Sequence, residues 1–265
     1  MMTIKAKVLT FGVAVLTVLG IGSASAAPEG YGAQSRLDVV QSRGEIRVCS
    51  TGDYRPFTYR DAAGAWSGID IDLAGDLARR LGVRLRLVQT TWKAIADDVG
   101  RKCDLAMGGV SVTLDRAKKG FYTDPYLRDG KTPITLCENE KRFQTLEQID
   151  QPGVRAIVNP GGTNEQFADA NLKRATIVRH PDNNTIFAEI MAGRADLMIT
   201  DATETRWQAK QNPRLCAVHP DEPFTFSEKA YLLPRDIVFK EWADQWLRLV
   251  LNDGTYARIA KPWLG

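Results

Sequence analysis

The segment GAWSGIDIDLAGDLARRLGVRLRLVQTT, residues 64–91, decides the fold class. Its first part has the apolar spacing of an amphipathic helix, and Gly82 is the kind of residue that commonly ends one. The run VRLRLVQTT, residues 83–91, follows directly and predicts a strand. A helix that leads straight into a strand is half of a strand–helix–strand unit.

Strand signals flank this segment on both sides. GEIRVCST, residues 44–51, predicts a strand before it, and CDLAMGGVSVT, residues 103–113, predicts a buried strand after it. KAIADDVGRK, residues 93–102, predicts a short helix between the last two strands. The alternating order predicts an α/β fold with a parallel sheet and with sites at the carboxyl ends of its strands.

The same alternation returns in the second half of the chain. Strands are expected at 154–160, 175–180 and 195–201, and helices at 145–150, 164–174 and 184–194. KAYLLPRD then leads to helices at 237–251 and 255–260, which we expect to cover the first lobe through Val238, Trp242, Trp246, Leu249 and Val250. Two α/β lobes joined by two crossings predict a hinge and an interlobe cleft. The predicted division is 27–131 with 225–265 for lobe 1 and 132–224 for lobe 2.

The first 26 residues have the pattern of an export signal. Lys5 and Lys7 precede an apolar run from Val8 to Ile21, and Ala24-Ser25-Ala26 offers a cleavage site. An uncleaved membrane anchor is the alternative, but the run is short for a membrane span. The sequence therefore predicts a periplasmic or secreted protein without a membrane partner after cleavage.

The charge balance points to no polyanionic partner. Cleavage would remove two of the 35 basic residues and none of the 32 acidic ones, which leaves a formal charge of +1. Neither nucleic acid nor a charged membrane surface is indicated as a partner.

Four cysteines, Cys49, Cys103, Cys137 and Cys216, lie far apart and form no C-x-x-C motif. An oxidising compartment permits two disulfides in three connectivities, and buried free thiols are the alternative. The lobe assignment favours the pairs 49–103 and 137–216.

Several motifs carry a resemblance to a known family. TGDYRPFTY, GGVSVTLDRAKKGFYTDPY and GRADLMITD, in this order, resemble type 2 periplasmic solute-binding proteins, in particular those for amino acids. YLRDGKTPITLC, RFQTLEQIDQPGV, IVNPGGTNE and CAVHP are similar to the periplasmic cyclohexadienyl dehydratases. That resemblance implies dehydration with decarboxylation of prephenate or L-arogenate, without a cofactor. It also implies a homo-oligomer, such as a trimer, which no stretch of this sequence indicates independently.

Arg116 follows the third strand, and a guanidinium there is suited to clamp a substrate carboxylate. The resemblance assigns this role to it, whereas a solvated arginine beside Lys118 and Lys119 is the alternative.

The turn NPGGTNE is the candidate for a second carboxylate site. Gly161, Gly162, Thr163 and Asn164 would offer backbone N–H groups and a hydroxyl at a helix N-terminus. Lys131 would add positive charge, although a solvent-exposed lysine is its plainer interpretation.

Further candidates for the cleft come from the ends of the strands. Asp201 matches the position that holds a ligand ammonium in related binding proteins, and a helix N-cap is its alternative. Gly108 and Gly109 would allow close backbone approach or tight sheet packing. The remaining candidate binding residues are Asp53, Tyr54, Phe57, Trp92 and Ser111.

Glu165 is the candidate catalytic residue. Expulsion of a ring hydroxyl needs a proton donor, and the resemblance assigns that role to Glu165. We expect burial and a bound dianion to raise its pKa in the complex, against the opposing pull of the helix N-terminus and Arg116. A first-turn glutamate that only stabilises its helix is the alternative.

Other chemistries have no support in the sequence. His180 and His219 are the two histidines, neither in a metal-ligand spacing, and no nucleophile-elbow or phosphate-loop motif is present. The sequence thus predicts a cofactor-free dehydratase, with a non-catalytic amino-acid-binding protein of an ABC transporter as the alternative.

Overall fold

The computed structural model describes residue 3 and residues 34–265. The chain divides into two units, Met1–Gln34 and Ser35–Gly265, and every helix and strand described lies in the second. The predicted export signal, with its apolar run and cleavage site, lies outside the described residues. No helix in the described part of the chain is both long and apolar enough to cross a membrane.

A five-stranded sheet forms the centre of the first lobe, in the order β5-β1-β6-β15-β7. β5, β1 and β6 run parallel, while β15 joins β6 and β7 antiparallel from the far end of the chain. The strands are β1 Glu45–Ser50, β5 Arg84–Gln89, β6 Leu105–Ala106, β7 Phe121–Tyr122 and β15 Leu232–Leu233. The parallel arrangement predicted for β1, β5 and β6 is therefore confirmed.

The second lobe repeats this design in the order β11-β10-β12-β9-β13. β11, β10 and β12 are parallel, and β9 runs antiparallel between β12 and β13. The strands are β9 Lys131–Leu136, β10 Arg155–Val158, β11 Thr176–Arg179, β12 Leu197–Asp201 and β13 Leu215–Ala217. All three strands predicted in this half are present.

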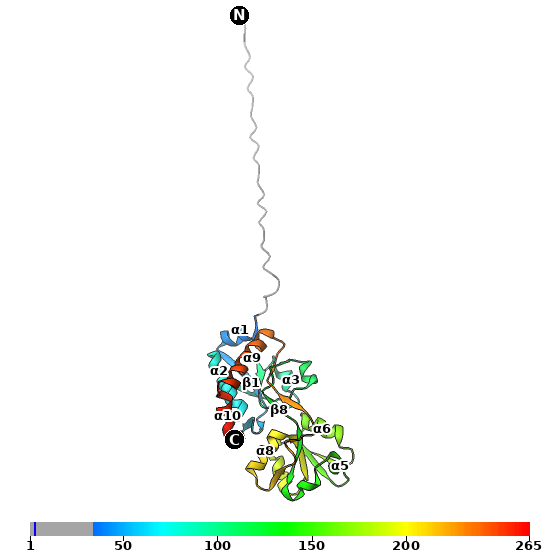
Figure 1. Ribbon diagram of the computed structural model, residues 1–265. Coiled ribbons are helices and arrows are strands. Elements are labelled where there is room, and N and C mark those ends of the chain that lie inside the picture. Colours follow the sequence, from blue (N-terminus) through cyan, green and yellow to red (C-terminus); the bar gives the residue numbers. More distant parts are fainter. Residues whose placement is uncertain (1–2, 4–33) are drawn as a thin grey trace. The chain divides into compact units, whose positions relative to one another are not determined.

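A two-stranded ribbon joins the lobes. The chain leaves the first lobe through β8 Leu127–Asp129 and returns through β14 Ser227–Lys229, and these strands pair antiparallel. β8 lies between the lobes in Figure 1. The predicted domain boundaries fall next to this ribbon and remain a prediction. A smaller sheet of β2 Asp53–Tyr54, β3 Thr58–Arg60 and β4 Trp66–Ser67 follows β1.

The helices cover the two sheets. α2 ends at Gly82, whose φ of 70° is readily adopted by glycine, as the sequence predicts. The helices are α1 Arg36–Arg43, α2 Ile69–Leu81, α3 Ile95–Asp98, α4 Leu114–Ala117, α5 Leu146–Ile149, α6 Thr163–Asn171, α7 Ile186–Met191, α8 Ala202–Gln211, α9 Ile237–Asn252 and α10 Thr255–Leu264. Two 3-10 turns, η1 Cys137–Arg142 and η2 Asn183–Thr185, complete the described elements.

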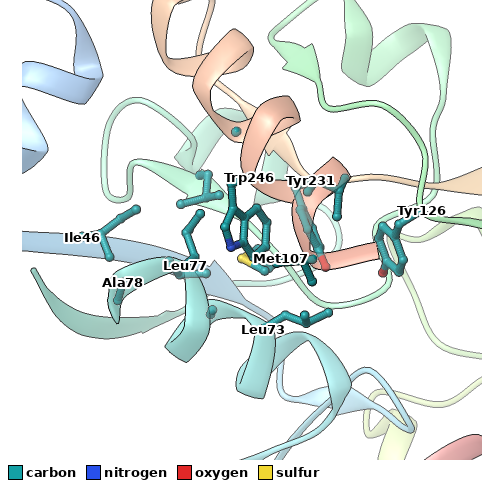
Figure 2. Close-up of a cluster of buried hydrophobic side chains, with 14 of the residues drawn as sticks. Ile46, Leu73, Leu77, Ala78, Met107, Tyr126, Tyr231 and Trp246 are labelled. Carbon is teal, nitrogen blue, oxygen red and sulfur yellow. The ribbon is translucent and has the colours of Figure 1, made fainter. Parts of the chain in front are cut away.

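The C-terminal helices α9 and α10 belong to the first lobe, where they lie beside α1 and α2 in Figure 1. The face of α9 that packs inward was partly mispredicted. Val238 and Leu249 are half exposed, whereas Phe239 and Leu247 are buried. The 3.6-residue period explains this, because Phe239, Ala243, Trp246, Leu247 and Val250 each lie three or four positions from another of the five along α9 and so line one face. Figure 2 shows Trp246 of this face beside Leu77 and Met107.

Two disulfides cross-link the lobes internally, and both predicted pairs are confirmed. Cys49–Cys103 joins β1 to the segment before β6, and Cys137–Cys216 joins η1 to β13. Each bond closes a long loop, which limits the freedom of the unfolded chain.

Replacing Cys137 and Cys216 together by serine should lower the free energy of unfolding by about 2–4 kcal/mol. The two cysteines are 79 positions apart, and without their disulfide the unfolded chain between them is no longer closed into a loop. Urea unfolding of the oxidised double variant and the wild type measures this, with Cys49–Cys103 intact in both. An unchanged unfolding midpoint would contradict the expectation.

Candidate active site

The ends of strands from both lobes meet around a small enclosed hollow. Tyr54, Trp92, Gly109 and Ser111 face it from the first lobe, and Asn159, Gly162, Thr163, Asn164, Asn183 and Asp201 face it from the second. Its volume is about 20 Å³, which is enough for roughly one water molecule. The lobes are thus in contact around this hollow, and a larger ligand enters this part of the cleft only when they separate.

Asp201, at the end of β12, is the centre of the contacts between the lobes. Its carboxylate accepts hydrogen bonds from Lys131 Nζ at 2.8 Å, from Lys229 Nζ at 2.5 Å and from the Tyr54 hydroxyl at 2.5 Å. Burial alone would raise the pKa of Asp201, but the two ammonium groups outweigh it and hold that pKa well below its usual range. Asp201 occupies the N-cap position of α8, yet its side chain makes no capping hydrogen bond.

Lys131 is buried rather than solvent-exposed, which overturns the plainer interpretation of this residue. Besides Asp201, its ammonium group donates to Thr163 Oγ1 at 3.0 Å and to Asn164 Oδ1. Burial lowers the pKa of Lys131. Lys131 therefore links β9 to the first turn of α6, and the Thr163 hydroxyl is engaged by the protein itself.

Lys229, in β14, was missed by the sequence reasoning. Its side chain has no exposed surface, and its ammonium group lies near Asp201, Ser111 and the Tyr54 hydroxyl. The ring of Phe57 is also close, with its centroid 5.9 Å from the ammonium nitrogen. The available signal was a lysine placed directly before the apolar run AYLLP, in the segment through which the chain was expected to return to the first lobe.

Arg116, in α4, is buried with its guanidinium toward the cleft. It donates to the Ser111 carbonyl at 2.9 Å and lies 5.8 Å from the ring centroid of Trp92. Burial lowers the pKa of Arg116, and within residues 34–265 no carboxylate forms an ion pair with it. A buried guanidinium without a carboxylate partner is well suited to bind an anionic ligand.

Glu165 lies in the first turn of α6, at the rim of the cleft. It lines a hollow of about 460 Å³ between the lobes together with Trp92, Thr113 and Arg116. Its side chain is one-fifth exposed, so it neither points into bulk water nor is fully enclosed.

The groups around Glu165 in this structure lower its pKa, whereas we expect burial and a bound dianion to raise it in the complex. The Gly161 N–H donates to its carboxylate at 2.7 Å and Arg179 Nε donates at 2.7 Å. These two donors lower the pKa of Glu165, because both stabilise the ionised form and together outweigh the opposing effect of burial. With these protein groups alone around it, Glu165 is a carboxylate.

The glycines after β6 serve packing rather than ligand contact through their N–H groups. Gly108 and Gly109 donate their N–H groups to Asp70 at 2.9 and 2.6 Å. A Cβ on Gly109 would lie 2.6 Å from the rings of Tyr54 and Phe57, and its φ of 68° favours glycine. Asp70 was not identified from the sequence, although it is fully buried near the start of α2.

The aromatic residues form one wall of the cleft. Tyr54 stacks on Phe57 at 5.4 Å and meets Trp92 edge-on at 5.5 Å, both measured between ring centroids. Phe57 has no exposed surface, so it supports Tyr54 from behind. Trp92 also donates to Asp53 at 3.0 Å, and burial raises the pKa of Asp53.

Two further residues of the second lobe were also missed. Asn183, in η2, donates to the Asp53 carbonyl at 2.7 Å and so connects the lobes. Glu204 is buried behind Asp201 and accepts a hydrogen bond from the Thr200 hydroxyl at 2.6 Å. Burial raises the pKa of Glu204 to about 8.

The chain matches the model of the bacterial extracellular solute-binding proteins, family 3, over residues 46–265, and it belongs to this family. The two-lobed α/β fold predicted from the sequence is confirmed by this match and by the observed sheets.

Within that family, the chain is 55% identical over 235 residues to the cyclohexadienyl dehydratase of Pseudomonas aeruginosa, covering 87% of each chain. It is also 34% identical to the crystal structure of the ancestral amino acid-binding protein AncCDT-1, a precursor of cyclohexadienyl dehydratase. That likeness has a TM-score of 0.80 and covers 87% of this chain and 100% of the other.

A variant of the ancestral cyclohexadienyl dehydratase AncCDT-3 is 48% identical with a TM-score of 0.56, over 88% of this chain and 97% of the other. The resemblance drawn from the sequence motifs is thereby confirmed.

Replacing Glu204 by glutamine should reduce the loss of stability on raising the pH from 5 to 8. The folded protein holds a proton on Glu204 throughout most of this range, whereas the unfolded chain has released it. The free energy of unfolding of the wild type therefore falls by up to about 1.4 kcal/mol per pH unit from this group alone. Urea unfolding of both proteins across this range checks it, and parallel pH dependences would contradict it.

Proposed function

We propose that the protein is a cyclohexadienyl dehydratase, a carbon–oxygen lyase that acts on prephenate, L-arogenate or both. The observation that carries this proposal is that Glu165 and Arg116 line one hollow between the lobes. A ligand in this hollow would be within reach of both side chains, which suits Glu165 as its proton donor and Arg116 as its anion clamp. The identity of 55% with a cyclohexadienyl dehydratase supports the assignment.

The reaction needs one proton and correct placement. A proton from Glu165 passes to the departing hydroxyl of the ring, and the ring carbon–oxygen bond breaks to release water. The ring carboxylate leaves as carbon dioxide, and its bonding electron pair enters the ring, which becomes aromatic. Prephenate dianion and one proton thus yield phenylpyruvate anion, carbon dioxide and water.

The charges in the cleft suit a dianion. Asp201 neutralises part of the charge of Lys131 and Lys229, whereas Arg116 forms no ion pair within residues 34–265. This guanidinium, together with the N-terminus of α6, favours two carboxylates on the ligand. We assign one to Arg116 and the other to the turn of residues 161–164.

The protonation of Glu165 depends on the bound ligand. The Gly161 N–H and Arg179 lower its pKa in the protein by itself. A dianion placed in the hollow beside Glu165 opposes this effect, because nearby negative charge favours the protonated carboxyl group. Substrate binding and uptake of the catalytic proton are therefore coupled.

A non-catalytic amino-acid-binding protein is the competing assignment, and AncCDT-1 is an amino acid-binding protein of the same fold. The contacts of Asp201 in the cleft argue against a binding protein for amino acids. Asp201, the predicted partner of a ligand ammonium, already binds two lysine ammonium groups.

We place the mature protein in the periplasm, after removal of residues 1–26. The family of extracellular solute-binding proteins and the predicted export signal both support this location. Assembly into a homo-oligomer such as a trimer stays a prediction, to be measured by light scattering.

Purified mature protein should convert prephenate to phenylpyruvate without an added cofactor, and Glu165→Gln should lower kcat by about 10²-fold or more, because it cannot donate the proton. Absorbance of phenylpyruvate in alkali measures turnover, and calorimetry measures binding of prephenate, which the variant should keep.

The matched control is Asp169→Asn, which makes the same carboxylate-to-amide change one turn further along α6 and at the same Arg179. We expect the activity of this variant to stay within roughly twofold of the wild type, as is usual for an exposed surface substitution. Full activity of Glu165→Gln would exclude Glu165 as the acid, and absence of turnover in the wild type would exclude the enzyme.

Arg179→Ala should move the basic limb of the pH–kcat profile to higher pH. Arg179 donates to Glu165 and lowers its pKa, so its removal lets Glu165 hold the catalytic proton at higher pH. Arg194→Ala, which breaks an exposed pair with Glu189, is the control and should leave the profile in place. If the pH–kcat profiles of the wild type, Arg179→Ala and Arg194→Ala superimpose, Arg179 does not control the pKa of Glu165 during catalysis.

A further inference from the structure

The turn before α6 in the second lobe lies directly against the segment between β5 and α3 in the first lobe. A Cβ on Gly161 would lie 3.0 Å from the Cβ, 3.1 Å from the backbone nitrogen and 3.3 Å from the Cα of Lys93. A Cβ on Gly162 would lie 3.6 Å from the Cβ and Cγ of Trp92. Position 161 is therefore the tighter of the two, and two of the three atoms that a side chain there would meet belong to the backbone, which cannot rotate away.

This contact divides the space between the lobes. On one side is the hollow of about 460 Å³ that Arg116 and Glu165 line. On the other side is a hollow of about 680 Å³, lined in part by Asp53. Trp92 and Pro160 line both hollows, so the turn and the segment that faces it form the wall between them. The contact is thus part of the cleft to which we assign the reaction.

The backbone conformation is a second reason for a glycine at position 161. The φ of Gly161 is 87°, in a region that other residues rarely adopt. Gly153, in the exposed turn before β10, has nearly the same φ of 86°, but a Cβ there would meet no atom of the described residues within 4 Å. Gly153 therefore has the backbone constraint of Gly161 without the contact to the other lobe.

The approach of the lobes at Gly161 sets the position of α6 relative to the first lobe. The first turn of α6, with Glu165, follows directly, and Arg116 lines the same hollow from α4 of the first lobe. A side chain at position 161 would push the turn away from Lys93 and carry the start of α6 with it. A displacement of about 1 Å in a reacting group can lower a rate by about 10²-fold.

We propose that Gly161 is a positioning residue: the absence of a side chain there lets the lobes close far enough to bring the first turn of α6 to a substrate held by the first lobe. The inference rests on the proposed function and assigns a further residue to the same site. Gly161 acts through the closeness of the turn and not through its N–H group, since alanine or asparagine would keep the donor that Glu165 accepts.

The test compares alanine and asparagine at position 161 with the same two residues at position 153. Asparagine adopts a positive φ more readily than alanine, yet its side chain is larger. Contact with Lys93 therefore predicts that Gly161→Asn lowers kcat for prephenate more than Gly161→Ala does, by about tenfold or more against the wild type. KM should change less, because the clamp Arg116 belongs to the first lobe. Gly153→Ala and Gly153→Asn should keep kcat within roughly twofold of the wild type.

Backbone strain alone predicts the opposite order, with Gly161→Ala the less active of the two variants. That order, or equal losses in the two variants, overturns the inference and leaves the dehydratase assignment intact. The same holds if kcat of the variants at position 161 matches that of the variants at position 153. Circular dichroism and urea unfolding establish that each variant compared is folded.

A cross-link tests the contact without turnover. In Lys93→Cys/Gly161→Cys the two Cβ atoms would lie 3.0 Å apart, so an opening of about half an ångström gives the usual separation for a disulfide. We expect a disulfide between positions 93 and 161, identified by mass spectrometry of peptides from the unreduced protein. The control Lys93→Cys/Gly153→Cys should form none between positions 93 and 153.

The cross-link also separates failure of the inference from failure of the proposed function. If the wild type does not turn over prephenate, the dehydratase assignment fails and the cross-link decides alone. Its formation then supports Gly161 as the contact at which the lobes close, and its absence from the folded double variant rejects that contact.

Discussion

The arrangement of the cleft depends on one buried ionic cluster. The carboxylate of Asp201, at the end of a strand in the second lobe, binds the ammonium groups of Lys131 and Lys229 and the hydroxyl of Tyr54 from the first lobe. A buried carboxylate is costly unless it is paired and hydrogen-bonded, and here both oxygens are satisfied. The same contacts therefore hold the lobes together, while Arg116 in the cleft forms no ion pair within the described part of the chain. An anionic ligand that enters between the lobes meets that guanidinium.

A second buried carboxylate supports the wall of the cleft on the first-lobe side. Asp70 accepts the N–H groups of Gly108 and Gly109 and the hydroxyls of Tyr126 and Tyr231. This fixes the turn after β6 at a distance that only glycine permits, since a side chain on Gly109 would collide with the aromatic rings. The binding surface is thus formed by rigid elements, which is what accurate placement of a reacting group requires.

For catalysis, a bound substrate has to raise the pKa of Glu165, which the protein by itself lowers. The N-terminus of α6 and Arg179 both stabilise its ionised form, so the protein alone keeps this carboxyl group deprotonated. An acid role then requires the negative charge of the substrate beside it, and the closing of the lobes around that substrate. A carboxyl group that takes up a proton from solution only when the substrate is bound need not stay protonated in the free protein.

The sequence left three disulfide connectivities open, and the lobe assignment favoured the two pairs that the structure has. By itself the sequence determined the alternation of strands and helices, the two lobes and several residues at strand ends that line the cleft. These follow from local periodicity, from glycines at turns and from the rule that parallel strands present their carboxyl ends on one side. Only the tertiary structure decided which groups are paired. Lys131 and Lys229 lie far apart in the chain yet share Asp201, and no local pattern encodes such a meeting. The contribution of Arg179 to the pKa of Glu165 and the inward face of α9 were likewise set by the tertiary structure, because burial and charge are properties of packing in space.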